Sequence, residues 1–401
     1  MDSIIDYVKK NGEYSILEMP FNEVDSLCLA QFSYLKINKS YEELLRQGEM
    51  VTPEKIATSD YTDELFSDER FRKNNIELFD AMASSKRFGN MKIFEYVDIS
   101  DPQWELQFSA MTFILDNTVT YVAFRGTDEY LYSWKEDFNM AYMTPIPAQI
   151  KAVQYLNYVG NAISGNIIVG GHSKGGNLAV YASMNAVESV RNRITDIYSH
   201  DGPGFQPEVL ESEAFQKISD RIKKLVPRSS IVGLCLQDQE NYEVVVCKYF
   251  GILQHDSYNW IVDGCRFVRG TNVHKMNEVR IRTINSWILD MDYEKRQDFV
   301  QMLFEILSGC GTDNLNDFKG EFLIRTKGML NSYNALDDKE KEMLQGVLKD
   351  LTIKVNETAR DYLTEQINEE REKYKQIIDE GNQRFNQCLD YVIKTIENLH
   401  K

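Results

Sequence analysis

Residues 171–175 read Gly-His-Ser-Lys-Gly and match the G-x-S-x-G pattern that surrounds a nucleophilic serine. A short apolar run at residues 167–170 precedes this segment, and residues 176–182 have the composition of a helix. A serine at such a turn exposes its hydroxyl over the sheet, and the helix N-terminus supplies N–H groups where an oxyanion develops. The pattern therefore predicts Ser173 as the nucleophile of an acyl-transfer reaction, in preference to a turn that only connects strand and helix.

A serine needs a base to take its proton, and in this kind of fold the chain order is serine, acid, histidine. Three of the five histidines are in unsuitable positions: His172 inside the turn, His200 before the acid candidate and His400 at the end. His255 follows a β-rich run at residues 242–249, which places it on a loop beyond a strand end. We expect His255 to be the base, with His274 as the alternative.

The acid is expected between the serine and the base. Asp201 ends a strand-like run at residues 194–200 and opens a turn, so its carboxylate should lie at a strand end. Asp238 follows a second β-rich run at residues 230–236 and is the second choice, whereas Asp256 is badly aimed at the ring of its neighbour in sequence. We expect Asp201 to orient the base, although an aspartate that stabilises its own turn remains the alternative.

Acyl transfer also needs two N–H groups that point at the developing oxyanion. Residues 121–128 form an apolar strand that runs into a glycine turn, Phe-Arg-Gly-Thr. We expect one N–H from Lys174 and the other from Thr127, whose hydroxyl is a candidate third donor. Arg125 in the same turn is expected to form a structural ion pair.

The elements around these residues indicate an α/β fold. Between residues 147 and 250, short apolar runs alternate with helical spacing, which is typical of a mostly parallel sheet covered by helices on both faces. Residues 104–115 and 118–124 are β-rich and joined by Asp-Asn, so they predict a hairpin. We also expect strands at residues 230–236 and 242–249.

The C-terminal part has a different character. No proline follows Pro227, and from about residue 285 apolar residues recur every three to four positions between charged ones. We expect residues 1–284 to form the sheet domain, with a helical lead-in at its N-terminus, and residues 285–401 to form a helical region. We expect the apolar faces of these helices to pack on the sheet domain, or to pair with a second copy of the chain in a homo-oligomer.

Composition excludes several classes of protein. The 401 residues carry a formal charge of −17, which argues against nucleic acid or an anionic membrane as main partner. No apolar stretch approaches the roughly 18 residues of a membrane span, and the six scattered cysteines suit a reducing, cytoplasmic location. No zinc-helix or phosphate-loop motif is present, so we expect neither a metal nor another cofactor.

The motifs together resemble a known pattern. Residues 124–127, Trp134, Asp137 and residues 171–176 look like the α/β-hydrolase pattern of the class 3 lipases. Many of those lipases carry the acid in a later loop, near a D-x-V-P sequence. The comparable residues 226–232 contain no aspartate, which favours Asp201. Lys174 replaces the commoner leucine or glutamine, a departure expected to alter substrate preference.

The wider pattern, with residues 201–205 and 254–256, is similar to an uncharacterised bacterial family of lipase-like hydrolases. The resemblance covers roughly residues 20–270 and leaves the helical tail outside. It implies a serine hydrolase that cleaves a lipid or acyl ester through an acyl-enzyme. In lipase-like enzymes the region of residues 127–147 can form a lid, and ordinary core packing of its apolar residues is the alternative. Thioesterase and peptidase activities belong to the same class. The alternative is a silent hydrolase fold that binds partners through its helical tail.

Overall fold

The computed structural model describes residues 1–350 except 63, 68–70, 237–240, 250, 274, 310, 315–321 and 348. The chain divides into two compact units, Met1–Val347 and Leu348–Lys401, and the elements described here belong to the first. The alternative acid Asp238, the alternative base His274 and the terminal His400 lie outside the described residues. The domain boundary after residue 284 stays a prediction.

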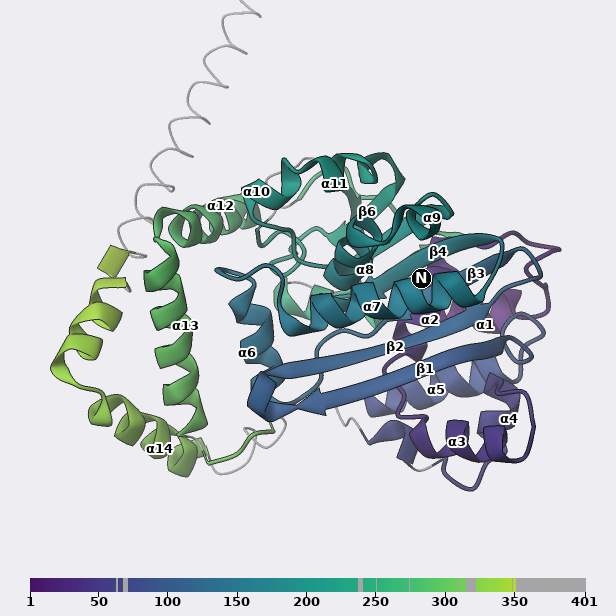
Figure 1. Ribbon diagram of the computed structural model, residues 1–401, viewed down its shortest axis with the longest axis horizontal. Coiled ribbons are helices and arrows are strands. Elements are labelled where there is room, and N and C mark those ends of the chain that lie inside the picture. Colours follow the sequence, from purple (N-terminus) through teal and green to yellow (C-terminus); the bar gives the residue numbers. More distant parts are fainter. Residues whose placement is uncertain are drawn as a thin grey trace, which may run out of the picture. The chain divides into compact units, whose positions relative to one another are not determined.

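A seven-stranded sheet forms the centre of the first unit, with its strands side by side in chain order (Figure 1). They are β1 (Lys92–Asp101), β2 (Leu106–Ile114), β3 (Val119–Phe124), β4 (Asn166–His172), β5 (Ile194–His200), β6 (Ile222–Pro227) and β7 (Glu243–Val245). The pairs β1–β2 and β2–β3 are antiparallel, and the strands from β3 to β7 are parallel. The predicted α/β class with a mostly parallel sheet is therefore confirmed.

Helices surround this sheet. The N-terminal ones are α1 (Ile4–Asn11), α2 (Glu23–Phe32), α3 (Asn38–Arg46), α4 (Pro53–Ala57) and α5 (Arg72–Ala83). Those between and after the strands are α6 (Leu131–Asn139), α7 (Pro147–Ala162), α8 (Lys174–Asn185), α9 (Glu188–Arg191), α10 (Pro207–Leu210) and α11 (Glu213–Gln216). Short 3-10 helices are η1 (Glu64–Phe66), η2 (Pro102–Trp104), η3 (Ser219–Arg221), η4 (Gly251–His255) and η5 (Ser257–Asn259), and β8 (Val262–Asp263) pairs with β9 (Arg266–Phe267).

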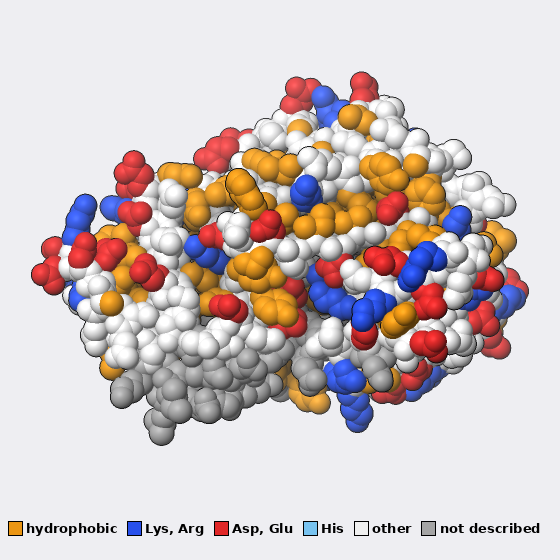
Figure 2. Space-filling view, turned by 60° about the horizontal axis from the view of Figure 1, so that its bottom comes forward, with side chains coloured by type: hydrophobic (Ala, Val, Ile, Leu, Met, Phe, Trp, Pro, Cys, Tyr) orange, Lys and Arg blue, Asp and Glu red, His pale blue; other side chains and the backbone are white. Residues whose placement is uncertain are grey.

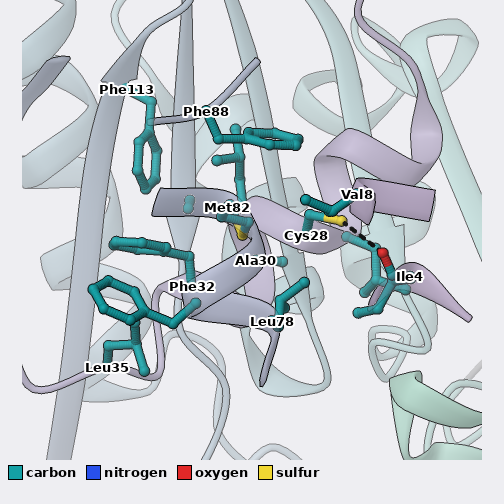
Figure 3. Close-up of a cluster of buried hydrophobic side chains, with 14 of the residues drawn as sticks. Ile4, Val8, Cys28, Ala30, Phe32, Leu35, Leu78, Met82, Phe88 and Phe113 are labelled. Atoms are coloured by element: carbon teal, nitrogen blue, oxygen red, sulfur yellow. Dashed lines mark hydrogen bonds between the residues drawn. The ribbon is translucent and has the colours of Figure 1, made fainter. Parts of the chain in front are cut away.

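Side chains of the central strands alternate between two apolar cores, as strand geometry requires. Val122 and Phe124 of β3 pack with α7 and α8, whereas Tyr121 and Ala123 pack with the N-terminal helices. Figure 3 shows part of the second core, drawn from Ile4, Val8, Cys28, Ala30, Phe32, Leu35, Leu78, Met82, Phe88 and Phe113. The parallel strands all end at the same edge of the sheet, and the packing on both faces holds those ends in place.

The predicted hairpin is confirmed. Strands β2 and β3 pair antiparallel, and the Asp116 carboxylate between them accepts from the N–H groups of Thr118 and Val119 at 2.6 and 2.9 Å. An aspartate that bonds to the backbone two and three residues later stabilises a tight turn. This hairpin carries β3 toward the loop that contains Thr127.

The predicted strand at residues 230–236 is wrong. These residues form turns, and the strand lies earlier, at β6, where two lysines interrupt the apolar pattern. Only Glu243–Val245 of the run at residues 242–249 forms strand β7. The turn at residues 230–236 instead packs against Asp201, because Ser230 Oγ donates to its carboxylate.

Helices α12 (Lys275–Asp290), α13 (Tyr293–Ser308) and α14 (Phe322–Ala335) follow the sheet region, and residues 338–347 are helical as well. The sequence predicts that the helical region begins at about residue 285, but helix α12 already begins at Lys275. Helix α13 packs against α6, with Val300 and Phe304 buried beside Leu131. In the described part of the chain, no helix is both long enough and apolar enough to cross a membrane.

Candidate active site

Ser173 lies at the sharp turn between β4 and α8, with φ 59° and ψ −132°. A positive φ is uncommon for a residue other than glycine, and the backbone is strained there. Both flanking glycines are needed, since a Cβ at Gly171 would lie 2.3 Å from the carbonyl carbon of Gly175, and one at Gly175 would lie 2.1 Å from Phe124 O. The turn thus has the form expected of a nucleophile elbow.

His255 reaches this serine from the end of η4. Its Nε2 lies 3.0 Å from Ser173 Oγ, and its Nδ1 lies 2.6 Å from the Asp201 carboxylate. With the Nδ1–H donating to Asp201, Nε2 is left to accept the serine proton. The structure therefore brings together the three residues that the sequence singles out as nucleophile, base and acid.

Asp201 is fully buried directly after β5 and has a φ of 52°. Its other carboxylate oxygen accepts from Ser230 Oγ at 2.5 Å, and its N–H donates to Leu225 O at 2.8 Å. A Cβ at Gly233 would lie 2.2 Å from the same carboxylate oxygen, so only glycine leaves room there. The side chain of Asp201 thus bonds to His255 and Ser230 rather than to its own turn.

Asp256 occupies a different role. Its carboxylate accepts from Tyr258 N at 3.0 Å and from Asn259 Nδ2 at 3.1 Å, which caps the short helix η5. Burial raises the pKa of this carboxyl. The aspartate next to the base in sequence therefore holds the loop that carries His255, while Asp201 faces the imidazole.

The loop after β3 lies against the elbow. A Cβ at Gly126 would lie 3.2 Å from Ser173 Cβ and 2.7 Å from His172 O, so the glycine permits this close approach. The loop places Thr127 beside the elbow, buried, with its Oγ1 donating to the Asp137 carboxylate. The hydroxyl expected as a third oxyanion donor is engaged there, so the backbone N–H is the candidate oxyanion donor of this residue.

Lys174 follows the serine, and its side chain turns into the protein interior. The ammonium donates to Glu136 Oε2 at 2.9 Å and to Gln107 O at 3.0 Å, and the residue is 1% exposed. Burial lowers the pKa of Lys174, but the carboxylates of Glu136 and Asp137 outweigh burial and raise it. The ammonium therefore remains charged between β2 and α6, away from solvent.

Arg125 forms the structural ion pair that the sequence predicts. Its Nη2 lies 2.7 Å from Asp98 Oδ1, and the side chain is buried. Lys36 also approaches Asp98, at 3.4 Å. These charges tie β1 to the end of β3, just before the loop that contains Thr127.

Two other histidines lie near the site. His200 is buried, its Nε2 lies 2.9 Å from Ser26 Oγ, and burial lowers its pKa to about 3, so its ring is neutral. His172 donates through Nε2 to the backbone carbonyl of His255 at 2.9 Å. No sequence pattern indicates the contact between His172 and His255, by which the residue before the nucleophile fixes the backbone of the candidate base.

The expected lid region contains helix α6. Leu131 is buried beneath α13, whereas Trp134 and Phe138 are 38% and 43% exposed. Figure 2 shows hydrophobic side chains exposed among acidic and basic ones on one face of the protein. Helix α6 therefore combines a packed side with exposed aromatic rings, and its role as a lid stays a prediction.

The comparisons with known proteins add a family. The sequence profile of the Mbeg1-like family matches residues 82–305, a range that includes Ser173, Asp201 and His255 and extends into α13. No curated protein is similar enough to match. Among solved structures, the crystal structure of M37 lipase matches with 14% identity over 54% of this chain and 73% of that chain, at a TM-score of 0.30.

Proposed function

The chain belongs to the Mbeg1-like family, and we propose that it is a serine hydrolase that cleaves a lipid or other acyl ester through an acyl-enzyme. One observation carries this proposal: an unbroken series of contacts joins Ser173 Oγ through His255 to the buried carboxylate of Asp201. A nucleophilic hydroxyl, a base within hydrogen-bond reach and an acid that orients the base form the triad by which many serine hydrolases activate the nucleophile.

The geometry supports the following reaction. Ser173 Oγ attacks the ester carbonyl as its proton passes to His255 Nε2. The imidazolium, stabilised by Asp201, returns that proton to the leaving alcohol, and the acyl group stays on the serine. A water molecule then gives its proton to His255 and attacks the acyl-enzyme, which releases the carboxylic acid and restores the serine hydroxyl.

The tetrahedral intermediates carry a negative oxygen. We assign its stabilisation to the backbone N–H groups of Thr127 and Lys174, because Gly126 brings the first loop against the elbow and Lys174 begins helix α8. A helix N-terminus carries partial positive charge and favours an anion beside it. Preorganised donors of this kind supply about 3–4 kcal/mol each in related chemistry.

The acyl class of substrate rests on the surroundings of the site. Helix α6 follows the loop that begins at Thr127, and it leaves Trp134 and part of Phe138, whose ring also packs on Phe304, exposed to solvent. Such rings suit an apolar acyl chain. The specific relation to class 3 lipases, the absence of a cofactor and the cytoplasmic location remain predictions from the sequence.

A panel of acyl esters with short, medium and long chains, together with a thioester and a peptide, tests the proposal. We expect turnover of at least one ester, and we expect Ser173→Ala to abolish it. Equal turnover by the alanine variant would show that hydrolysis does not pass through this serine. If no acyl compound is turned over and Ser173 is inert, the chain is a silent fold that binds partners.

A further inference from the structure

The two residues proposed to supply the oxyanion N–H groups send their side chains to adjacent carboxylates of one helix. Thr127 Oγ1 donates to Asp137, and Lys174 Nζ donates to Glu136 at 2.9 Å. Asp137 Oδ1 also lies 3.6 Å from Lys174 Nζ. Helix α6 therefore holds both sides of the proposed oxyanion hole at once.

Glu136 is tied on both of its oxygens. Oε2 accepts from Lys174 and from the N–H of Gln107 at 3.1 Å, and Oε1 accepts from the N–H of Ala148 at 2.8 Å. The side chains of Glu136 and Lys174 are both 0% exposed. This one carboxylate thus joins α6, the elbow, β2 and the start of α7.

A buried ion pair is an inefficient source of stability. Removing two charges from water costs about as much as their attraction returns, and a well-packed apolar pair is often equally stable or better. Glu136 and Lys174 offset that cost with further bonds to backbone groups. What the pair adds beyond stability is a fixed geometry, because charge-assisted hydrogen bonds are short and directional.

That geometry bears directly on catalysis. Lys174 directly follows Ser173 in the chain. Because its side chain is held in one direction, its backbone is restrained as well, and with it the direction of the N–H beside Ser173. An oxyanion donor must lie within about 0.5 Å of its productive position, and misplacement by about 1 Å can cost about 100-fold in rate. The buried Glu136–Lys174 pair restrains the N–H of Lys174 in this way, although neither side chain is exposed to a substrate.

We propose that Glu136 and Lys174 form a positioning pair that sets the oxyanion hole of this enzyme. Glu136 acts through the Lys174 side chain on the N–H beside Ser173, while Asp137 holds the opposite donor through Thr127. This inference rests on the proposed function. It assigns the lysine of the elbow to the geometry of the hole rather than to substrate preference.

A double-mutant cycle tests the pair. We would compare Glu136→Gln, Lys174→Met and the double variant with the wild type, measuring kcat and KM on the best ester and the rate of Ser173 labelling by a fluorophosphonate. Each single variant should lower kcat and the labelling rate about 10- to 100-fold with KM nearly unchanged, since the loss lies in the transition state. Circular dichroism and the thermal midpoint report folding separately.

The double variant separates positioning from mere stability. It removes both charges, so its thermal midpoint should recover relative to the single variants, while kcat should stay low. Recovery of kcat together with the midpoint would overturn the inference, as would wild-type kcat in either folded single variant. If the single variants do not fold, the double variant alone decides between these results.

Lys135→Met is the matched control, because Lys135 lies on the same helix but pairs with Glu105 and Gln301. We expect this control to keep wild-type kcat. A comparable loss in the control would mean that any lesion in α6 impairs turnover, which overturns a specific role for Glu136. Failure of the wild type itself to label at Ser173 would instead refute the proposed function, and this inference with it.

Discussion

His255 Nδ1 lies 2.6 Å from the carboxylate of Asp201, across 54 residues of sequence. The carboxylate is fully buried, and its second oxygen is held by Ser230 Oγ. A short bond from a buried, fixed carboxylate holds an imidazole in one tautomer and one orientation. The relationship therefore depends on the turn that carries Ser230 and Gly233 as much as on the two residues themselves.

Substitution of Gly233 by alanine should disturb this bond. The new Cβ would lie 2.2 Å from Asp201 Oδ1 and 3.0 Å from Ser230 Oγ, so the carboxylate or the turn must move. We expect a loss of about 1–3 kcal/mol in the free energy of unfolding and at least about a tenfold loss of kcat. Urea denaturation and steady-state kinetics measure the two effects.

Gly346→Ala is the control for that substitution, because nothing lies within 4 Å of its Cβ position. Its stability should be unchanged or slightly raised, since alanine favours a helix. Wild-type turnover by the Gly233→Ala variant would contradict the account of how Asp201 is held.

Loss of the base or of the acid should have graded effects. His255→Ala should reduce kcat about as much as loss of the serine, because the members of a triad act as a unit. Asp201→Asn should cost about 10⁴-fold through the wrong tautomer of His255. Nearly full activity of the asparagine variant, measured on the same ester, would mean that another group orients the imidazole.

His200 should make stability depend on pH. Burial lowers its pKa to about 3 in the folded protein, from an ordinary value of 6.5. The unfolded chain therefore binds a proton that the folded protein does not, and stability falls as pH drops from 6.5 toward 3. The slope from this residue is up to about 1.4 kcal/mol per pH unit.

The variant His200→Gln removes this titration and keeps a donor near Ser26. Urea denaturation between about pH 7 and about pH 4 should show a shallower loss of stability in the variant than in the wild type. If the free energy of unfolding falls equally steeply with pH in both proteins, then His200 is protonated in the folded protein or does not control the pH dependence of stability.

The residues after Val347, and in part those from Asp337 onward, should not be needed for ester hydrolysis. The first compact unit ends at Val347, whose carbonyl accepts from Trp287 Nε1 at 3.2 Å, and Leu344 is buried against Met302. A chain that ends after Val347 should unfold cooperatively and retain turnover. One that ends before Asp337 should lose thermal stability with Leu344 but keep some turnover, because it still contains Ser173, Asp201 and His255.

Turnover and thermal unfolding of both truncated chains check this prediction. Complete loss of activity in a truncated chain that still unfolds cooperatively would assign the missing segment a part in the reaction.

Local features of this protein are the ones that sequence reasoning predicts. The elbow at Ser173 depends on glycines at fixed positions within one turn, and the β2–β3 hairpin depends on the aspartate between its strands. Both can be recognised because the residues that cause them are neighbours in the chain. The chain order of an acid followed by a histidine then favoured Asp201 and His255.

Features that depend on distant parts of the chain were missed. Lys224 is buried within β6, where its charge interrupts the apolar pattern by which a strand is recognised, whereas the apolar turn at residues 230–236 has the composition of a strand. The Glu136–Lys174 pair joins residues 38 positions apart, and neither residue signals its partner. Only the packing of α6 onto the sheet brings these two charges together.

The central claim is that Ser173 is an activated nucleophile, and covalent labelling tests it most directly. The protein would be treated with a fluorophosphonate, digested and analysed by mass spectrometry, beside Ser173→Ala. We expect one adduct, on Ser173, and none on the alanine variant, whose thermal midpoint should be equal or slightly higher because residues kept for function are often not the most stable choice at their position. An unlabelled wild type, or an adduct that persists in the alanine variant, would contradict the account.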